Sequence, residues 1–549
     1  MLNLFATHVR GACAALFTLL LATPLFAQTK TISRTYEPVV VEAGTPTVQP
    51  LLGASINDLT AYRYDAGSGN FFAIPFQIDE LSADGEFLQE SDGVVDDNDQ
   101  IVFMPGDTGD RASTDKWVGD SVNEKRLELE VSDPLAATGK GWIYLFRGVA
   151  NKPSVPAYVS YSRGPSTTAG TDTVKGVSYV ESHDPAGWFT DVAVNPAAGG
   201  DGLDIMDRQK IRASGVYLIF TASINEQENL PFVGVRFGGG PVRGLRELAL
   251  SFVFLGSALD TFTVVTQYFP YSTSFSAKGA KIPTIDGLQV KSVRQSIDLN
   301  DHASGMKFFN SFNLGNGINV DGAADQVNES LSDSPTDSLN WSLITGNPGS
   351  ALVLLKVPRI GQARKLYYKD NAAVDNTDTG DKKSYADTGV LITSTGTITG
   401  SFSFDFASYY LGKNQAASIG DEFKRRALSP MQVSATEQTR TSTAVQGGHS
   451  GPLSFVLHDA QPNPFWPLRG NVRLSFTATT SRVAPALRIY NLLGQQVARF
   501  DFARAADGGT QNILWNGRSS NGELLPAGIY FYQLQAGSQI STKKLVIIR

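Results

Sequence analysis

A chain of 549 residues is too long to fold around one hydrophobic core, so we expect about two to four domains. The formal net charge of −7 gives no electrostatic support for binding nucleic acid, which excludes that class of function. Charged residues make up only 18% of the chain, and its 53 glycines favour a globular protein with many turns.

The N-terminal segment has the features of a signal peptide. "MLNLFATHVR" carries Arg10 and no acid, and the apolar run "AALFTLLLATPLFA" follows it and ends in small residues. We expect residues 1–27 to be a signal peptide cut after Ala27, with an uncleaved membrane anchor as the alternative. The sole cysteine, Cys13, lies inside this segment, so residues 28–549 contain no disulfide, thiolate ligand or cysteine nucleophile.

Short apolar or alternating runs follow one another through the body of the chain. "LELEVSD", "GWIYLFRGV", "GVYLIFTASI", "LALSFVF" and "ALVLLKV" have strand length, and Gly, Pro, Asn and Asp separate them. This pattern predicts an all-β fold of several β-sandwiches. We expect an N-terminal β domain at 28–150, a larger sandwich-like body at 151–427 and a polar, Ser/Thr-rich linker at 428–454.

One acidic stretch of the N-terminal domain is a candidate calcium loop. In "SDGVVDDNDQIVF" the oxygen-bearing side chains of Asp92, Asp96, Asn98 and Asp99 lie within eight positions of one another, and Ca²⁺ prefers such ligands. The spacing is not that of an EF-hand, so a solvated acidic turn is the alternative. Two further acidic groups are interpreted as surface loops rather than sites: Asp201, Asp204 and Asp207, and Asp370, Asp375, Asp378, Asp381 and Asp387.

Motifs of common enzymes are absent from the sequence. There is no Gly-x-Ser-x-Gly elbow, His-Glu-x-x-His helix or phosphate-binding glycine loop, and only His183 and His302 could serve a triad in the body. The stretch "GGGPVRGLRELALSF" resembles strands of large bacterial carbohydrate-processing β-sandwiches. Trp188, Tyr268 and Tyr271 could stack on sugars, although aromatic residues of this kind are more often core. Distant carboxylate pairs for glycoside hydrolysis stay open.

The C-terminal segment, 455–549, reads as a small antiparallel sandwich. In "NVRLSFTA" the side chains of Val472, Leu474 and Phe476 alternate toward one face. Tyr530, Tyr532 and Leu534 alternate in the same way, and Trp515 would anchor the core. Turns at "LLGQ" and "SSNGELLPAG" separate the strands, which makes a module of roughly 90 residues, about the size of an Ig-like domain.

The motifs "QPNPFWP", "LRIYNLLGQQV", "WNGRSSNGELLPAGIYFYQL" and "KKLVIIR" resemble the C-terminal sorting domain of type IX secretion substrates. They are equally similar to the Ig-like module of flagellar hook-capping proteins. Trp466 stands where the family's first motif has a second Asn, and Asn516 replaces the Asp of its Trp-Asp-Gly motif. The residues that carry the resemblance are Asn463, Pro464, Gly494, Trp515, Gly517, Gly522, Gly528, Tyr530, Lys543 and Lys544.

The resemblance implies export through both membranes of a bacterium to the cell surface or the medium. Its implied partners are the type IX outer-membrane translocon and its sorting peptidase, with surface lipopolysaccharide or glycans as further partners. A purely structural Ig-like domain is the alternative. For the body we expect a non-catalytic binding or structural module, and the rival hypothesis is a carbohydrate-active enzyme of β-sandwich type.

Overall fold

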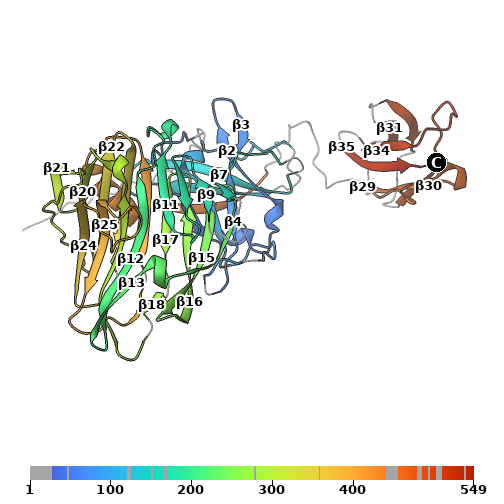
Figure 1. Ribbon diagram of the computed structural model, residues 1–549. Helices are drawn as coiled ribbons and strands as arrows, with labels where there is room; N and C mark the ends of the chain where they lie inside the picture. Colours follow the sequence, from blue (N-terminus) through green and yellow to red (C-terminus); the bar gives the residue numbers. More distant parts are fainter. Residues whose placement is uncertain are drawn as a thin grey trace, which may run out of the picture. The chain divides into compact units, whose positions relative to one another are not determined.

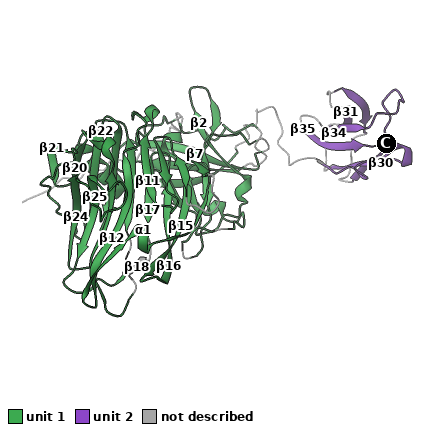
Figure 2. Ribbon diagram, in the orientation of Figure 1, with its two compact units in different colours: residues 1–442 green, residues 443–549 purple. Residues whose placement is uncertain are grey.

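The computed structural model describes residues 28–440 and 455–548, apart from short gaps. The gaps fall at 46–47, 84, 89, 120–124, 150–151, 165–170, 277–279, 283, 358, 403, 479–484, 492–494, 503–509 and 537–538. The chain divides into two compact units, residues 1–442 and 443–549 (Figure 2). Both are built from antiparallel sheets, so the predicted all-β, multi-domain fold is confirmed. Within the described residues, no helix combines the length and apolar character needed to cross a bilayer.

Two sheets pack face to face at the N-terminal side of the first unit. The smaller sheet has the strand order β1 (Val39–Glu42), β5 (Gln100–Phe103), β4 (Phe76–Asp79). The larger sheet has the order β28 (Gln432–Thr439), β6 (Lys125–Ser132), β7 (Lys140–Arg147), β2 (Leu59–Asp65), β3 (Asn70–Ala73). Alternating apolar residues of both sheets, such as Val39, Ile101, Leu129 and Ile143, form the core between them.

Strand β28 occupies the first part of the predicted linker at 428–454, and residues 441–454 lie outside the described residues. Residues 432–439 pair with β6 along its whole length, from Gln432 opposite Ser132 to Thr439 opposite Lys125. Only Val433 and Ala435 turn toward the core, and the other face is polar because β28 is an edge strand. A polar edge strand lacks the apolar alternation that marks most strands, which is why the segment resembled a linker.

The larger part of the first unit is a second sandwich (Figure 1). Its five-stranded sheet has the order β13 (Phe220–Asn225), β12 (Met206–Tyr217), β19 (Leu288–Leu299), β25 (Ser384–Thr393), β24 (Ala363–Asn371). The nine-stranded sheet has the order β14 (Phe232–Gly239), β15 (Gly244–Phe254), β16 (Ser257–Tyr268), β17 (Ser272–Ser276), β27 (Asp405–Leu411), β23 (Gly349–Lys356), β22 (Leu339–Gly346), β20 (Lys307–Asn310), β21 (Asn313–Asn319). Val290, Val390 and Ile392 of the first sheet pack against Leu250 and Val264 of the second.

Smaller sheets and helices complete the first unit. A third sheet has the order β11 (Phe189–Val194), β10 (Tyr179–His183), β9 (Asp172–Lys175), β8 (Ser160–Arg163). A two-stranded sheet pairs β18 (Ala280–Ile282) with β26 (Gly400–Phe402). A short helix, α1 (Glu226–Asn229), follows β13. The longer α2 (Ser418–Leu428) packs Phe423 on the outer face of the nine-stranded sheet, where Trp341 Nε1 donates to Asp421 Oδ1 at 2.9 Å.

The second unit is a sandwich of two small sheets. One has the order β29 (Phe455–Leu457), β30 (Val472–Ala478), β33 (Thr510–Trp515), and the other β32 (Gln496–Asp501), β31 (Ala486–Asn491), β34 (Gly528–Ala536), β35 (Gln539–Ile547). The residues predicted to face its core are buried, which confirms the alternation expected along these strands. They are Val472, Leu474, Phe476, Trp515, Tyr530, Tyr532 and Leu534.

Candidate functional site

A buried polar network lies where the four-stranded sheet meets the nine-stranded sheet. Alternation along β10 turns Tyr179, Glu181 and His183 to the same side, and all three are buried. His183 Nδ1 lies 2.6 Å from Asp172 Oδ1, on the neighbouring strand β9. Across from it, Arg246 Nε on β15 donates to both oxygens of Asp172, at 3.1 and 3.0 Å. Two carboxylates thus face one histidine and one guanidinium, away from solvent.

Tyrosine hydroxyls complete this network. Tyr268 donates to Glu181 Oε1 at 2.8 Å and lies 3.2 Å from His183 Nε2, and Tyr410 donates to the other Glu181 oxygen at 3.4 Å. Burial and the charge of Glu181 raise the pKa of both phenols, so they are hydrogen-bond donors at neutral pH. Burial opposes ionisation of Asp172, but His183 and Arg246 outweigh it and hold the pKa of that carboxyl below its usual value.

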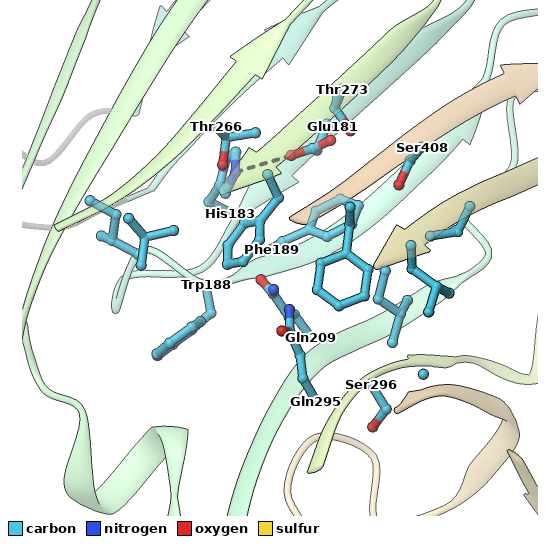
Figure 3. A pocket seen from close by; sticks show the side chains of 18 of the residues that line it. Glu181, His183, Trp188, Phe189, Gln209, Thr266, Thr273, Gln295, Ser296 and Ser408 are labelled. Atoms are coloured by element: carbon cyan, nitrogen blue, oxygen red, sulfur yellow. Dashed lines mark ion pairs between the residues drawn. The ribbon is translucent and has the colours of Figure 1, made fainter. Parts of the chain in front are cut away.

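A cavity of about 70 Å³ borders the network (Figure 3). His183, Glu181, Gln209 and Gln295 surround it together with apolar side chains. Small-molecule sites in proteins usually span about 300–1,000 Å³, so this cavity has room for water rather than for a sugar ring. Trp188, at 2% exposure, and Tyr268 are core residues, so they do not form an external sugar-stacking platform.

A larger cleft, of about 370 Å³, separates the N-terminal sheet from the β14–β15 hairpin. Gly238–Gly240 and Gln77 line it, and a Cβ atom at Gly240 would lie only 2.8 Å from Gln77 Oε1, so glycine permits this close approach. Asp79 accepts from Arg243 Nε at 2.7 Å, yet burial raises the pKa of Asp79 above its usual value.

The more accessible carboxylates of this cleft belong to Glu80 and Glu247. Glu80 Oε1 accepts the N–H groups of Asp92 and Gly93 at 3.1 and 3.0 Å, which ties the cleft to the predicted calcium loop. Glu247 forms an ion pair with Arg236 on the facing strand β14. The cleft therefore offers carboxylates, a guanidinium and exposed backbone to a ligand.

The predicted calcium ligands mostly form hydrogen bonds with backbone groups of the acidic loop and of Leu81. Asp99 is buried, and its two oxygens accept from Leu81 N at 3.2 Å and Asp96 N at 2.8 Å. Asp92 Oδ1 accepts from Val94 N at 2.8 Å, and Asn98 Nδ2 donates to the carbonyl of Leu81. Among the described residues no group of three or more His, Cys, Asp or Glu side chains has the geometry of a metal site. Calcium binding stays a prediction.

Sequence reasoning missed a second buried network, on the outer face of the five-stranded sheet. The Nζ of Lys210, whose side chain is fully buried, contacts Asp298 on β19 and lies 3.0 Å from Asp378 Oδ2 in the loop between β24 and β25. Arg212 Nη2 donates to Asp378 Oδ1 at 2.8 Å, and Arg294 lies 3.6 Å from the buried Asp387. Two of the acids interpreted as surface loops, Asp378 and Asp387, are thus buried ion-pair partners.

The charge balance of this second network shifts the pKa values of its acids. Burial, followed by the neighbouring charge of Asp387, raises the pKa of Asp298 to about 9. Burial and the charge of Asp381 raise the pKa of Asp207 to about 6. Burial also opposes ionisation of Asp378, but Arg212 and Lys210 keep the pKa of its carboxyl well below the usual range.

The other acids of those two groups, and His302, lie apart from these networks. Asp204 Oδ1 accepts from Val192 N and Met206 N, and Asp370 Oδ2 accepts from Asp321 N and Gly322 N. Asp375 accepts from Thr377 within its own turn. His302 is exposed, with Nδ1 2.8 Å from the carbonyl of Asp204. These side chains organise loops.

In the second unit, the motif residues connect its first turn to its last strand. Asn463 donates to the carbonyl of Lys544 at 3.0 Å and accepts from Val546 N at 2.9 Å; Pro464 follows it through a cis peptide. Lys543 Nζ lies 2.6 Å from Asp459. Trp515 Nε1 donates to the carbonyl of Arg518 at 2.9 Å.

The glycines and the tyrosine of the motifs shape turns. Gly517 has a φ of 73°, and a Cβ atom there would lie 2.7 Å from Pro467. Gly522 has a φ of 82° in the turn before β34, which starts at Gly528. The Tyr530 hydroxyl donates to the carbonyl of Pro526 at 2.9 Å. Gly494 lies outside the described residues.

Residues 462–548 match the family described as the secretion system C-terminal sorting domain. This segment is a sorting domain. The match confirms the resemblance to type IX substrates, and the sorting domain marks the chain as a protein exported across the outer membrane, to the cell surface or the medium. The match covers the C-terminal unit and leaves the body unassigned.

Comparisons beyond the sorting domain are weak. No curated protein matches the sequence. An α-mannosidase from Enterococcus faecalis V583 aligns over 89% of this chain and 55% of its own, with 10% identity and a TM-score of 0.37. A glycosyl hydrolase family 38 protein from Enterococcus faecalis aligns over 89% and 57%, with 11% identity and a TM-score of 0.33. PorZ, a surface component of the type IX secretion system of Porphyromonas gingivalis, aligns over 73% and 83%, with 9% identity and a TM-score of 0.15.

These similarities are too low to carry an argument about the body. The chain spans little more than half the length of the mannosidase it matches. Unlike the sorting domain, the body must be interpreted from its own cavity, cleft and networks.

Proposed function

We propose that the body is a non-catalytic binding or structural module, delivered to the bacterial surface by the sorting domain. The observation that carries this proposal is the enclosure of the His183 network, which holds the body's only buried histidine among the described residues. His183, Glu181 and Asp172 are each at most 5% exposed, and the cavity beside them is small. A general acid or base must come within about 2.6–3.2 Å of a substrate atom, which this enclosure prevents.

Export is the first part of the proposal to test. We propose that residues 1–27 direct the chain across the inner membrane and that the outer-membrane translocon and its sorting peptidase act on the sorting domain. Deleting residues 457–549 should leave the body in the periplasm, whereas the full chain reaches the surface or the medium. N-terminal sequencing of the exported protein should begin at Gln28. Surface export of the truncated chain would overturn the sorting role.

The cleft beside Gly238–Gly240 is the proposed ligand site of the module. Its volume lies within the range of small-molecule sites, and its carboxylates and Arg236 can hydrogen-bond the hydroxyl groups of a glycan or of surface lipopolysaccharide. The same carboxylates support the second candidate function, a carbohydrate-active enzyme that would use Glu80 and Glu247.

One experiment separates these two functions. The full chain is screened on a glycan array, and every glycan that binds is incubated with it and analysed for cleavage products. Binding without turnover, weakened by Glu80→Gln or Glu247→Gln, supports the module. Turnover that either variant abolishes supports the enzyme instead. Glu437→Gln is the matched control and should change neither result, because it removes an exposed carboxylate of β28 that pairs with Lys125 on β6.

A further inference from the structure

Two hairpins of the body end in exposed apolar turns. The β12–β13 hairpin turns at Leu218–Ile219, and the β15–β16 hairpin turns at Leu255–Gly256. The exposed fractions are 64% for Leu218, 85% for Ile219 and 72% for Leu255. The run "GVYLIFTASI", read from the sequence as one strand, therefore has its most apolar part at the solvent-exposed end of a hairpin. Scattered exposed apolar residues are ordinary, but a cluster at adjacent turns is not.

The backbone of both turns is unfavourable for the residues that occupy it. Leu218 has a φ of 55° and Leu255 a φ of 49°, a left-handed conformation that leucine rarely adopts. Two-residue hairpin turns normally place Gly or Asn at such positions. Leucine at both turns therefore costs folding free energy and also exposes apolar surface. Strain of this kind in two equivalent positions points to a function of the side chains rather than of the fold.

The two turns form one surface. The rings of Tyr217 and Phe254, the last residues of β12 and β15, lie 5.4 Å apart, so the turns that follow them are neighbours. Phe220 and Leu259, on the returning strands, are 65% and 45% exposed. We call these five residues the apolar tip: Leu218, Ile219, Phe220, Leu255 and Leu259. The strands that carry it run to the end of the body labelled β13 and β16 in Figure 1.

The charge pattern around the apolar tip suits a hydrocarbon phase. Residues 213–225 contain no Asp, Glu, Lys, Arg or His, and neither do residues 248–259. The first segment is centred on its turn and ends before Glu226, whereas the second ends before Asp260, four residues after Gly256. A charged side chain in hydrocarbon is costly, so such a gap is what shallow insertion requires. The backbone is also compatible, because Tyr217 pairs with Phe220 and Leu218 N donates to the carbonyl of Gly287.

We propose that the apolar tip inserts into the outer leaflet of a lipid bilayer and holds the body against a membrane surface. Insertion would bury the five side chains of the apolar tip. The exposed Asp260, next to Leu259, and Asp286, next to Gly287, lie at its edge, so their carboxylates would stay at the level of the lipid headgroups. The proposal assumes delivery to the cell surface by the sorting domain, but it is independent of what the cleft binds.

Substitutions in the two turns separate lipid binding from folding. Leu218→Gly and Leu255→Asn place residues that favour a positive φ at the two turn positions that have one, and Ile219→Asn removes the most exposed apolar side chain. This triple variant should therefore melt at the same temperature as the wild type or higher. Its sedimentation with vesicles of phosphatidylethanolamine and phosphatidylglycerol should fall about tenfold or more, because insertion of three large side chains is lost. Val374→Asn is the control: Val374 is 63% exposed and follows β24, whose Asn371 end lies far from the tip in the sheet register.

A site-specific label tests insertion directly. Because Cys13 is the only cysteine, the full chain with Cys13→Ser can carry one environment-sensitive fluorophore at Ile219→Cys or at Val374→Cys. The fluorescence emission of the label at 219 should shift to shorter wavelength when vesicles are added, and that of the label at 374 should not. The shift at 219 should persist at high salt and with vesicles of neutral phosphatidylcholine. Three outcomes would overturn the proposal: no vesicle binding by the wild type, equal binding by the triple variant, or a wild-type dimer that the triple variant dissociates, which would make a second copy the occupant.

Discussion

Replacing Lys210 by methionine is expected to destabilise the body by about 3–5 kcal/mol, the usual effect of removing one partner of a buried ion pair. The side chain of Lys210 is 0% exposed, and its ammonium contacts Asp298 and lies 3.0 Å from Asp378. Methionine has similar length and no charge, so packing is retained and the ionic effect is isolated. The variant leaves the acids of this network facing only Arg212 and Arg294.

The expected change in melting temperature follows from the size of the body. With an unfolding entropy of about 2.1 cal/mol/K per residue over roughly 400 residues, a loss of about 3–5 kcal/mol lowers the midpoint by about 4–6 °C. Lys365→Met is the matched control. Lys365 on β24 pairs with Glu329 but is 46% exposed, so its loss should change the midpoint by about 1 °C or less. Differential scanning calorimetry of the full chain measures both.

The pH dependence gives a second readout of the same network. The folded protein keeps a proton on Asp298 up to about pH 9, whereas the unfolded chain releases it near the ordinary carboxyl pKa of 3.8. The folded state therefore binds more protons between these values, so this group makes the unfolding free energy fall as pH rises. Asp298→Asn should flatten that slope. A Lys210→Met midpoint within about 1 °C of wild type, or an unchanged slope in Asp298→Asn, would refute the charge balance.

Three further predictions concern separate parts of the chain. The raised pKa of Asp207, about 6, means that its stabilising protonated form is lost as pH rises through 6, so Asp207→Asn should reduce the loss of thermal stability between pH 4 and 7 relative to wild type. Calcium binding by the acidic loop predicts a lower melting temperature in EGTA than in calcium chloride, and equal midpoints would remove that hypothesis. Asn463→Ala removes two hydrogen bonds to β35, so it should destabilise the sorting domain by about 1–3 kcal/mol and reduce export, whereas the exposed Asn512→Ala should do neither.

The sorting domain could be predicted from sequence because its signals are local. Alternation at Val472, Leu474 and Phe476 fixes the buried face of β30, and glycines mark the turns where φ is positive. The motifs also occur in a defined order over fewer than a hundred residues. Each of these signals can be read within a window of about ten residues, without knowing which strands pair.

The candidate sites of the body could not be predicted, because their members are distant in sequence. Arg246 and Asp172 are 74 residues apart, and Tyr410 and Glu181 are 229 apart. No local pattern distinguishes Asp378, which binds Lys210, from Asp375, which caps its own turn. The apolar tip was missed for a different reason. An apolar run predicts burial, and only the pairing of β12 with β13 shows that this run spans a turn.

Because residues 28–549 contain no cysteine, this exported chain must fix its strand pairing without disulfides, and the buried ion pairs contribute to that. A disulfide constrains the unfolded chain, whereas an ion pair such as Lys210–Asp378 acts only after the chain has folded around it. Its desolvation offsets most of its attraction, so its main effect is on specificity rather than on stability. A one-residue slip of β12 against β19 would turn Lys210 into the apolar core and Ile211 outward, with no partner for the charge. The buried ion pairs therefore favour one strand register over the alternatives that long strands permit. In other exported proteins a disulfide can fix the pairing of two segments covalently.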